Sequence, residues 1–181
     1  MTTLLQILIY LLQTIFGFFT TMLLVRTLMR AMRISFVNQV GQFVLVTTNW
    51  AVVPFQRVLP SVGRVDLSAL VPAWLLQVAL LFIIGMLRWN GFAEPVSLLL
   101  HALVFGVVEL VRTALYLLMF VVILDCAISW VNPHSPLGPV LRMLTRPFLA
   151  PLRKIIPPVA NVDLSPVALL VIVQILLIVI S

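Results

Sequence analysis

Val65-Asp66-Leu67-Ser68 recurs as Val162-Asp163-Leu164-Ser165, 97 positions further along a chain of 181 residues. This recurrence decides the fold, because the same offset aligns rarer residues outside the tetrapeptide, and such matches rarely arise by chance. We therefore predict an internal duplication, with one unit over residues 1–90 and a second over residues 91–181. The further aligned pairs are Gly41 with Gly138, Thr48 with Thr145, Pro54 with Pro151, Arg57 with Lys154, Pro60 with Pro157 and Gln77 with Gln174.

The composition excludes a soluble globular protein. Hydrophobic residues make up 63% of the chain and charged residues 9%, and the mean hydropathy is +1.24. Soluble domains carry about 45–50% apolar and about 25% charged residues. A folded core of this size cannot hide so much apolar surface from water. We therefore expect lipid to surround most of the chain.

Four apolar stretches are predicted to span the membrane, which takes about 20 residues; the fourth of them is short. Two spans with a long loop between them form each unit, so both units return to the side on which they began. We predict an all-α membrane protein of two tandem, parallel two-helix repeats, related by an axis along the membrane normal. The first apolar stretch lacks the features of a signal peptide and is expected to be a retained anchor. The predicted spans are residues 4–25, 68–87, 96–124 and 166–180.

The basic residues predict how the chain is oriented. The net charge is +6, and the two loops within the units hold most of the arginines. By the positive-inside rule both loops face the cytoplasm and both termini lie outside. Basic residues beside spans favour anionic lipid headgroups over nucleic acid as partners. They are Arg26, Arg30, Arg33, Arg57 and Arg64 in the first loop, and Arg142, Arg146, Arg153 and Lys154 in the second.

Both loops are predicted to contain amphipathic helices. In the second loop apolar residues recur near helical spacing from Leu137 to Ile155, with basic residues in the gaps. Because Pro147 and Pro151 interrupt this pattern, we expect two short helices there rather than one. The first loop is a weaker version, from Val40 to Leu59. Such helices lie in the membrane interface or re-enter the bundle, and both alternatives stay open.

Three segments of the second unit carry a resemblance to a known family. DCAISWVNP (125–133), TRPFLAPLRKIIP (145–157) and DLSP (163–166) resemble, in order and spacing, the YggT (YlmG-like) family of small membrane proteins. The first unit departs from the pattern, because Gln39 follows Asn38 and Asn49-Trp50 replaces an expected Arg/Gln-Pro. The resemblance implies a better preserved site in the second unit, which includes Asn132. It also implies a location in a bacterial inner membrane, or in a plastid membrane. The roles that it implies are in cell division or envelope organisation, in osmotic and ion homeostasis, or in haem-protein assembly.

Polar residues inside the spans are candidates for function. Glu109 and Arg112 stand three residues apart near the middle of the third span, and so share one helix face. Ionisable groups in hydrocarbon line a path or pair with one another. The pair therefore serves either an ion or proton path or the locking of helices together. Gln77 and Gln174 are expected to hydrogen-bond between helices.

Three aspartates stand at the predicted membrane interface. Asp125 ends the third span, and we expect either a salt bridge to Arg26 or Arg30 across the units or simple exposure. Asp66 and Asp163 precede helix starts, where they would cap the helices and neutralise neighbouring arginines. The alternative is recognition of lipid headgroups or a partner, together with Arg57, Arg64, Arg153 and Lys154.

Catalytic and cofactor chemistry find little support in the sequence. His101 and His134 are 33 positions apart, about 50 Å along a continuous helix, so they cannot clasp one haem. Cys126 is the only cysteine, which rules out an internal disulfide. We expect no enzyme activity, cofactor or metal. The leading hypothesis is a membrane scaffold or assembly factor with lipid, membrane-protein or homo-oligomer partners; the alternative is a small channel or transporter element.

Overall fold

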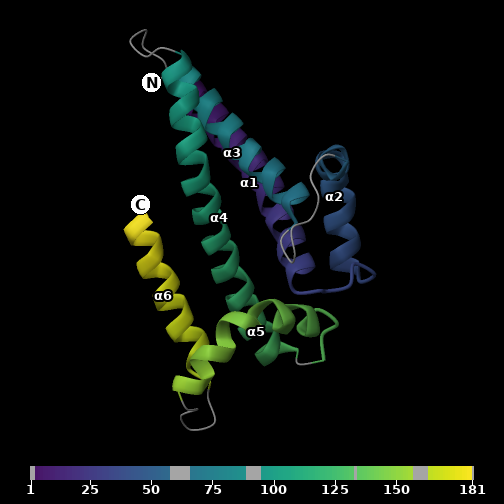
Figure 1. The fold of residues 1–181 in the computed structure, drawn as a ribbon. Coiled ribbons are helices and arrows are strands. Elements are labelled where there is room, and N and C mark those ends of the chain that lie inside the picture. The colour runs from purple at the N-terminus through teal and green to yellow at the C-terminus, as the bar shows by residue number, and fades with distance from the viewer. Residues whose placement is uncertain (1–2, 58–65, 89–94, 133, 157–162, 181) are drawn as a thin grey trace. The chain divides into compact units, whose positions relative to one another are not determined.

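A computed structural model describes residues 3–57, 66–88, 95–132, 134–156 and 163–180. All the secondary structure of the described residues is helical, which confirms the predicted all-α class (Figure 1). The arrangement as four spans in two tandem repeats stays a prediction. The predicted boundary between units, at residues 90 and 91, lies outside the described residues. The helices are α1 (Thr3–Ala31), α2 (Gln39–Gln56), α3 (Leu67–Leu87), α4 (Pro95–Val131), α5 (Gly138–Ile155) and α6 (Ser165–Ile180).

Three helices, α1, α3 and α4, are long and apolar enough to cross a membrane, with mean hydropathies of 2.0, 2.3 and 2.3. The chain is therefore a membrane protein. α1 and α4 both extend past the predicted spans, and α4, with 37 residues, is about 55 Å long. α6 is equally apolar but has 16 residues, or about 24 Å, so its crossing of the membrane stays a prediction.

The contacts divide the chain into two compact units. The first holds α1, α2, α3 and the part of α4 up to Thr113, and the second holds the rest of α4 with α5 and α6. In the first unit α2 lies beside α1 and α3, and its Val44 and Val52 are buried. Gly106 lets α4 approach α3 closely, since a Cβ there would stand 2.8 Å from a methyl of Val78.

The second unit has its own small core. Five buried residues from α4, α5 and α6 pack together, and α5 crosses the other two helices (Figure 1). Because α5 supplies Leu149 to this core, its apolar face packs on protein. The core residues are Val122, Leu149, Leu169, Val173 and Leu177.

The prediction of two short helices in the second loop is wrong, since α5 is one helix of 18 residues that contains both prolines. A proline removes the hydrogen bond to the carbonyl four residues earlier. Here the freed carbonyls belong to Met143 and Pro147, and Met143, Pro147 and Pro151 all lie on the exposed side of the helix. Because one exposed face carries both defects, the helix continues with its buried face intact.

Candidate functional site

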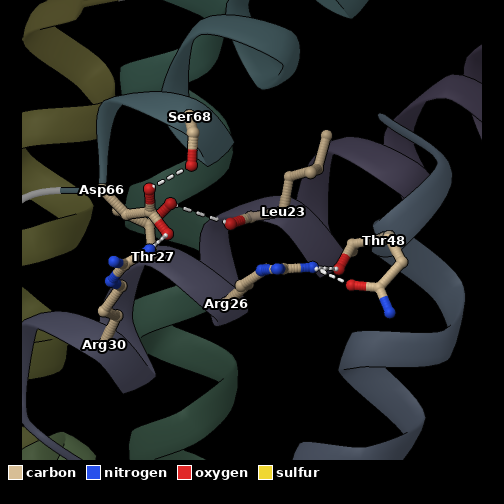
Figure 2. Close-up of polar contacts among 8 residues, drawn as sticks. Leu23, Arg26, Thr27, Arg30, Thr48, Asp66 and Ser68 are labelled. Carbon is tan, nitrogen blue, oxygen red and sulfur yellow. Dashed lines mark hydrogen bonds and ion pairs between the residues drawn. The ribbon is translucent and has the colours of Figure 1, made fainter. Parts of the chain in front are cut away.

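Polar side chains, among them the buried Arg26, Thr48 and Asp66, join α1, α2 and α3 at the C-terminal part of α1 (Figure 2). Arg26 points from α1 toward α2, where its Nη1 donates to Thr48 Oγ1 and to Asn49 Oδ1, each at 2.8 Å. Arg26 is 6% exposed and Thr48 is 1% exposed. The hydroxyl of Thr48 in turn donates to the carbonyl of Val44 at 2.6 Å. A guanidinium buried in this unit is thus held by two neutral oxygen acceptors.

One turn further along α1, Arg30 points toward the start of α3 instead (Figure 2). Its Nη1 lies 2.6 Å from Asp66 Oδ2, and the hydroxyl of Ser68 donates to the other carboxylate oxygen. Asp66 is 1% exposed. Its side chain accepts no backbone N–H of α3; its backbone carbonyl accepts those of Ala69 and Leu70 instead. The carboxylate therefore links α3 to α1 and is closed to an outside ligand.

The matching aspartate of the second unit, Asp163, lies in a more open site. It accepts from Arg153 Nε at 2.7 Å and from the backbone N–H of Ser165 at 2.9 Å. The Asp163 and Arg153 side chains are 38% and 54% exposed. Burial raises the pKa of Asp163, but hydrogen bonds from Ser165 and Arg153, with the charge of Arg153, outweigh it and bring that pKa below its ordinary value.

Asp125 of α4 accepts a hydrogen bond from Thr145 of α5, with 2.9 Å between Oδ2 and Oγ1. Thr145 is buried and Asp125 is half-buried. The predicted salt bridge from Asp125 to Arg26 or Arg30 would join the two units, and it stays a prediction. Inside the first unit Arg26 donates hydrogen bonds to Thr48 and Asn49, and Arg30 pairs with Asp66.

The intramembrane pair also forms in the structure. Arg112 Nη1 lies 2.5 Å from Glu109 Oε1 on α4, and the two side chains are 27% and 31% exposed. Beside them Thr113 donates to the Glu109 carbonyl, and Gln77 of α3 donates to the Thr113 hydroxyl at 3.3 Å. A polar seam thus runs between α3 and α4 next to the ion pair, whereas Gln174 of α6 is exposed.

The remaining predicted residues lie on the surface of the two units. Arg57 follows α2, and Asn132 follows α4; both are exposed. Arg64 lies outside the described residues. The basic residues of α5 are all on its exposed side: Arg142, Arg146, Arg153 and Lys154.

Sequence reasoning missed the contact of Arg26 with Thr48 and Asn49. The signal that could have found it is the offset that aligns Thr48 with Thr145, because a polar residue retained in an apolar stretch marks a buried contact. Thr48 accepts a buried hydrogen bond from Arg26, and Thr145 donates a partly buried one to Asp125, so the two buried threonines have partners of opposite charge.

Comparison with known proteins agrees with the resemblance. The protein is 32% identical over 163 residues, 90% of this chain and 86% of the other, to an uncharacterized protein of Vibrio alginolyticus encoded in the proC 3' region. It is 30% identical to an uncharacterized Pseudomonas aeruginosa protein, over 88% and 80% of the two chains. It is 29% identical to uncharacterized protein YggT of Escherichia coli K12, over 92% and 85%. No solved structure matches. The CCB3/YggT family model matches residues 5–87 and 104–181, and the chain belongs to that family.

Proposed function

We propose that this protein is an integral membrane scaffold or assembly factor, without catalytic activity of its own, that binds anionic lipid and partner membrane proteins through α5. The observation that carries the proposal is the charge on that helix. Its exposed side carries four cations over 18 residues, while its opposite side is buried. Such a face attracts anionic headgroups with about 1 kcal/mol per basic residue near the surface.

The packing of α5 supports a fixed display of these charges. Leu149 is buried against Val122 of α4 and Leu169 of α6, so the helix is held to the bundle rather than tethered by a loop. Arg153 forms an ion pair with Asp163, which neutralises much of its attraction for anionic lipid. We therefore assign most of the attraction to Arg142, Arg146 and Lys154.

The proposal includes a four-span arrangement of two tandem repeats in the same orientation. In support, α1, α2 and α3 alternate as an apolar, an 18-residue and an apolar helix, and α4, α5 and α6 do the same. The family model matches one segment over each set. Both loops face the cytoplasm in this proposal, which rests on their basic residues, and the bacterial relatives support an inner-membrane location.

The test is the lipid that the protein retains. We would reconstitute the protein into vesicles of phosphatidylcholine with phosphatidylglycerol, extract it into native nanodiscs, and measure the enrichment of the anionic lipid. An Arg146→Gln and Lys154→Gln double variant should lose most of that enrichment. Arg88→Gln, which neutralises an exposed arginine just after α3, is the matched control and should retain it. Equal enrichment in all three proteins would overturn the proposal.

A second candidate is a small channel or transporter element. The observation that favours it is the Glu109–Arg112 pair, which is partly exposed within an apolar helix. Charged groups at this depth commonly mark ion or proton pathways. If the pair lines a path, vesicles that contain the protein conduct protons or ions, and Glu109→Gln changes that flux. Vesicles that stay tight with the unmodified protein would remove this candidate.

A further inference from the structure

The exposed side of α2 carries a row of large apolar side chains. Phe43, Val46, Trp50 and Val53 are three or four residues apart, so they share one side of the helix and form what we call the α2 stripe. These four residues are between 44% and 77% exposed. None of the 18 residues of α2 is charged. If water covered this side of α2, all four residues would be left unfavourably hydrated.

The corresponding helix of the second unit, α5, carries cations that α2 lacks. Three basic residues of α5 have uncharged counterparts in α2 at the 97-residue offset: Arg142 aligns with Leu45, Arg146 with Asn49, and Arg153 with Gln56. Basic side chains favour the level of the anionic headgroups, whereas uncharged apolar side chains favour hydrocarbon. The two helices therefore suit different depths, although each has 18 residues and follows an apolar helix.

A contact with α1 places the α2 stripe along that helix. The rings of Trp50 and Phe19 meet edge to face, with 5.5 Å between their centroids. Phe19 precedes Arg26, the first charged residue of α1, by seven positions, or about 10 Å along the helix. Since α1 is long and apolar enough to cross a membrane, its uncharged part lies in the hydrocarbon. Trp50 therefore lies beside a part of α1 that acyl chains surround.

The polar contact of α2 with α1 lies away from the stripe. Thr48 Oγ1 and Asn49 Oδ1 both accept from the guanidinium of Arg26, which is buried (Figure 2). α2 thus turns polar atoms toward its neighbouring helix and apolar side chains outward. A helix that meets water has the opposite arrangement. This arrangement suits hydrocarbon, where polar groups need partners within the protein.

We propose that α2, unlike α5, lies among the acyl chains of the membrane lipids, with the α2 stripe against them. Acyl chains fit this surface because it is uncharged and continues the exposed apolar surface of α1, where Phe18 contacts Phe19. Arg33 and Arg57 are the charged residues that flank α2 in the sequence, and such long side chains can extend to the headgroups. Neither proposed function assigns a role to α2, so the inference can be tested separately from both.

The test measures whether lipid, water or protein covers the α2 stripe. In a Cys126→Ser background, which contains no other cysteine, Val46→Cys takes a nitroxide spin label. Met143→Cys is the matched control, because Met143 is the counterpart of Val46 in α5 and is also exposed. Both proteins are reconstituted into vesicles of phosphatidylcholine with phosphatidylglycerol. Power-saturation spectroscopy then compares collisions with oxygen, which concentrates in hydrocarbon, and with a water-soluble nickel chelate.

The label at Val46 should collide with oxygen severalfold more often than with the chelate, and the label at Met143 should show the reverse. Val53→Cys, two turns further along the stripe, should repeat the result at Val46 and guards against a local disturbance of the helix.

Three results overturn the proposal. If the chelate reaches Val46 as readily as Met143, water covers the stripe. If Val46 is protected from both reagents, a second copy or a partner protein covers it. If Met143 also favours oxygen, the two helices do not differ in depth. Lipid retention by α5 is measured independently, so its loss or survival leaves the result at Val46 unaffected.

Discussion

The repeated Asp-Leu-Ser lies at the start of α3 and at the start of α6, but the two aspartates have opposite surroundings. Asp66 is buried and pairs with Arg30 of α1, whereas Asp163 is partly exposed and pairs with Arg153 of α5. At the 97-residue offset Arg30 corresponds to Ala127, and Arg153 corresponds to Gln56. The arginine that pairs with the aspartate thus lies on the apolar helix α1 in the first unit and on the amphipathic helix α5 in the second. A repeated acid therefore does not imply a repeated site, because the partner sits on a different element.

A second contrast concerns the repeated threonines. Thr48 accepts from the buried cation Arg26, whereas Thr145 donates to the carboxylate Asp125. A hydroxyl can do both, since it has one donor and two acceptor lone pairs. The same residue therefore serves a cationic site in the first unit and an anionic site in the second. In the first unit the charged partner of this threonine is buried, whereas in the second it is half-buried.

The largest expected effect tests the contrast between the buried Asp66 and the partly exposed Asp163. Asp66→Ala should lower the free energy of unfolding by about 2–3 kcal/mol. The buried Ser68 hydroxyl then loses its acceptor, and Arg30, whose side chain is 43% exposed, loses its ion pair. Asp163→Ala should cost less than about 1 kcal/mol, because water and headgroups reach its partner. Unfolding in detergent micelles titrated with sodium dodecyl sulfate, followed by circular dichroism, measures both. Equal losses would contradict the difference in burial.

The threonines should differ in the same direction by a smaller amount. Thr48→Val should cost about 2 kcal/mol, since a buried guanidinium then loses one of its two acceptors. Thr145→Val should cost about 1 kcal/mol, because Asp125 is half-buried and can be solvated. The same detergent titration compares them, and valine keeps the shape of the side chain. A larger loss for Thr145→Val would show that the anionic site is the more closed one.

An arginine introduced on α4 should give Asp163 a partner on an apolar helix, as Asp66 has in Arg30. Ala127→Arg places an arginine on α4 at the position that corresponds to Arg30. Arg153→Gln should cost about 0.5 kcal/mol in the natural protein, as expected for an exposed pair, and nothing measurable beside Ala127→Arg. A double-mutant cycle in micelles measures this coupling. Full additivity of the two substitutions would mean that Asp163 does not reach α4.

The smallest effect is a pH dependence that arises from Asp163 in the second unit. The pKa of Asp163 is lowered in the folded protein, so its contribution is present above the ordinary value of 3.8 and is lost as the pH falls through the folded value. The difference in unfolding free energy between the natural protein and Asp163→Asn should be constant from pH 5 to pH 7. It should shrink below about pH 3.8, with a total change under about 1 kcal/mol, given the exposure of the pair. A difference that grows on acidification would refute the assigned direction.

Much of the fold could be read from the sequence, and particular residues show where that reading stopped. Apolar runs correctly predicted α1, α3 and α4 within a few residues, apart from the extension of α1 to Ala31 and of α4 to Val131. The helix interruption expected at Pro147 and Pro151 does not occur, because both prolines fall on one exposed face. Where a proline falls relative to a packed face depends on the neighbouring helices, which a local rule does not include.

In the candidate site, too, some contacts could be predicted from the sequence and others could not. Glu109 and Arg112 are close in the sequence, so helical spacing alone placed them on one face, and they do pair. Arg30 and Asp66 are 36 positions apart, and only the packing of α1 against α3 brings them together. Local pairs follow from the geometry of one helix, whereas pairs between helices follow from which helices touch.

By itself the sequence determined that this protein lies in lipid and is helical, since its apolar content exceeds what a soluble core can bury and a backbone in hydrocarbon must satisfy its own hydrogen bonds. Only the tertiary structure decided which of the two repeated aspartates is buried, which arginine holds it, and which side of α5 carries charge to the surface. Those outcomes depend on side chains contributed by different helices, and the sequence does not state their distances.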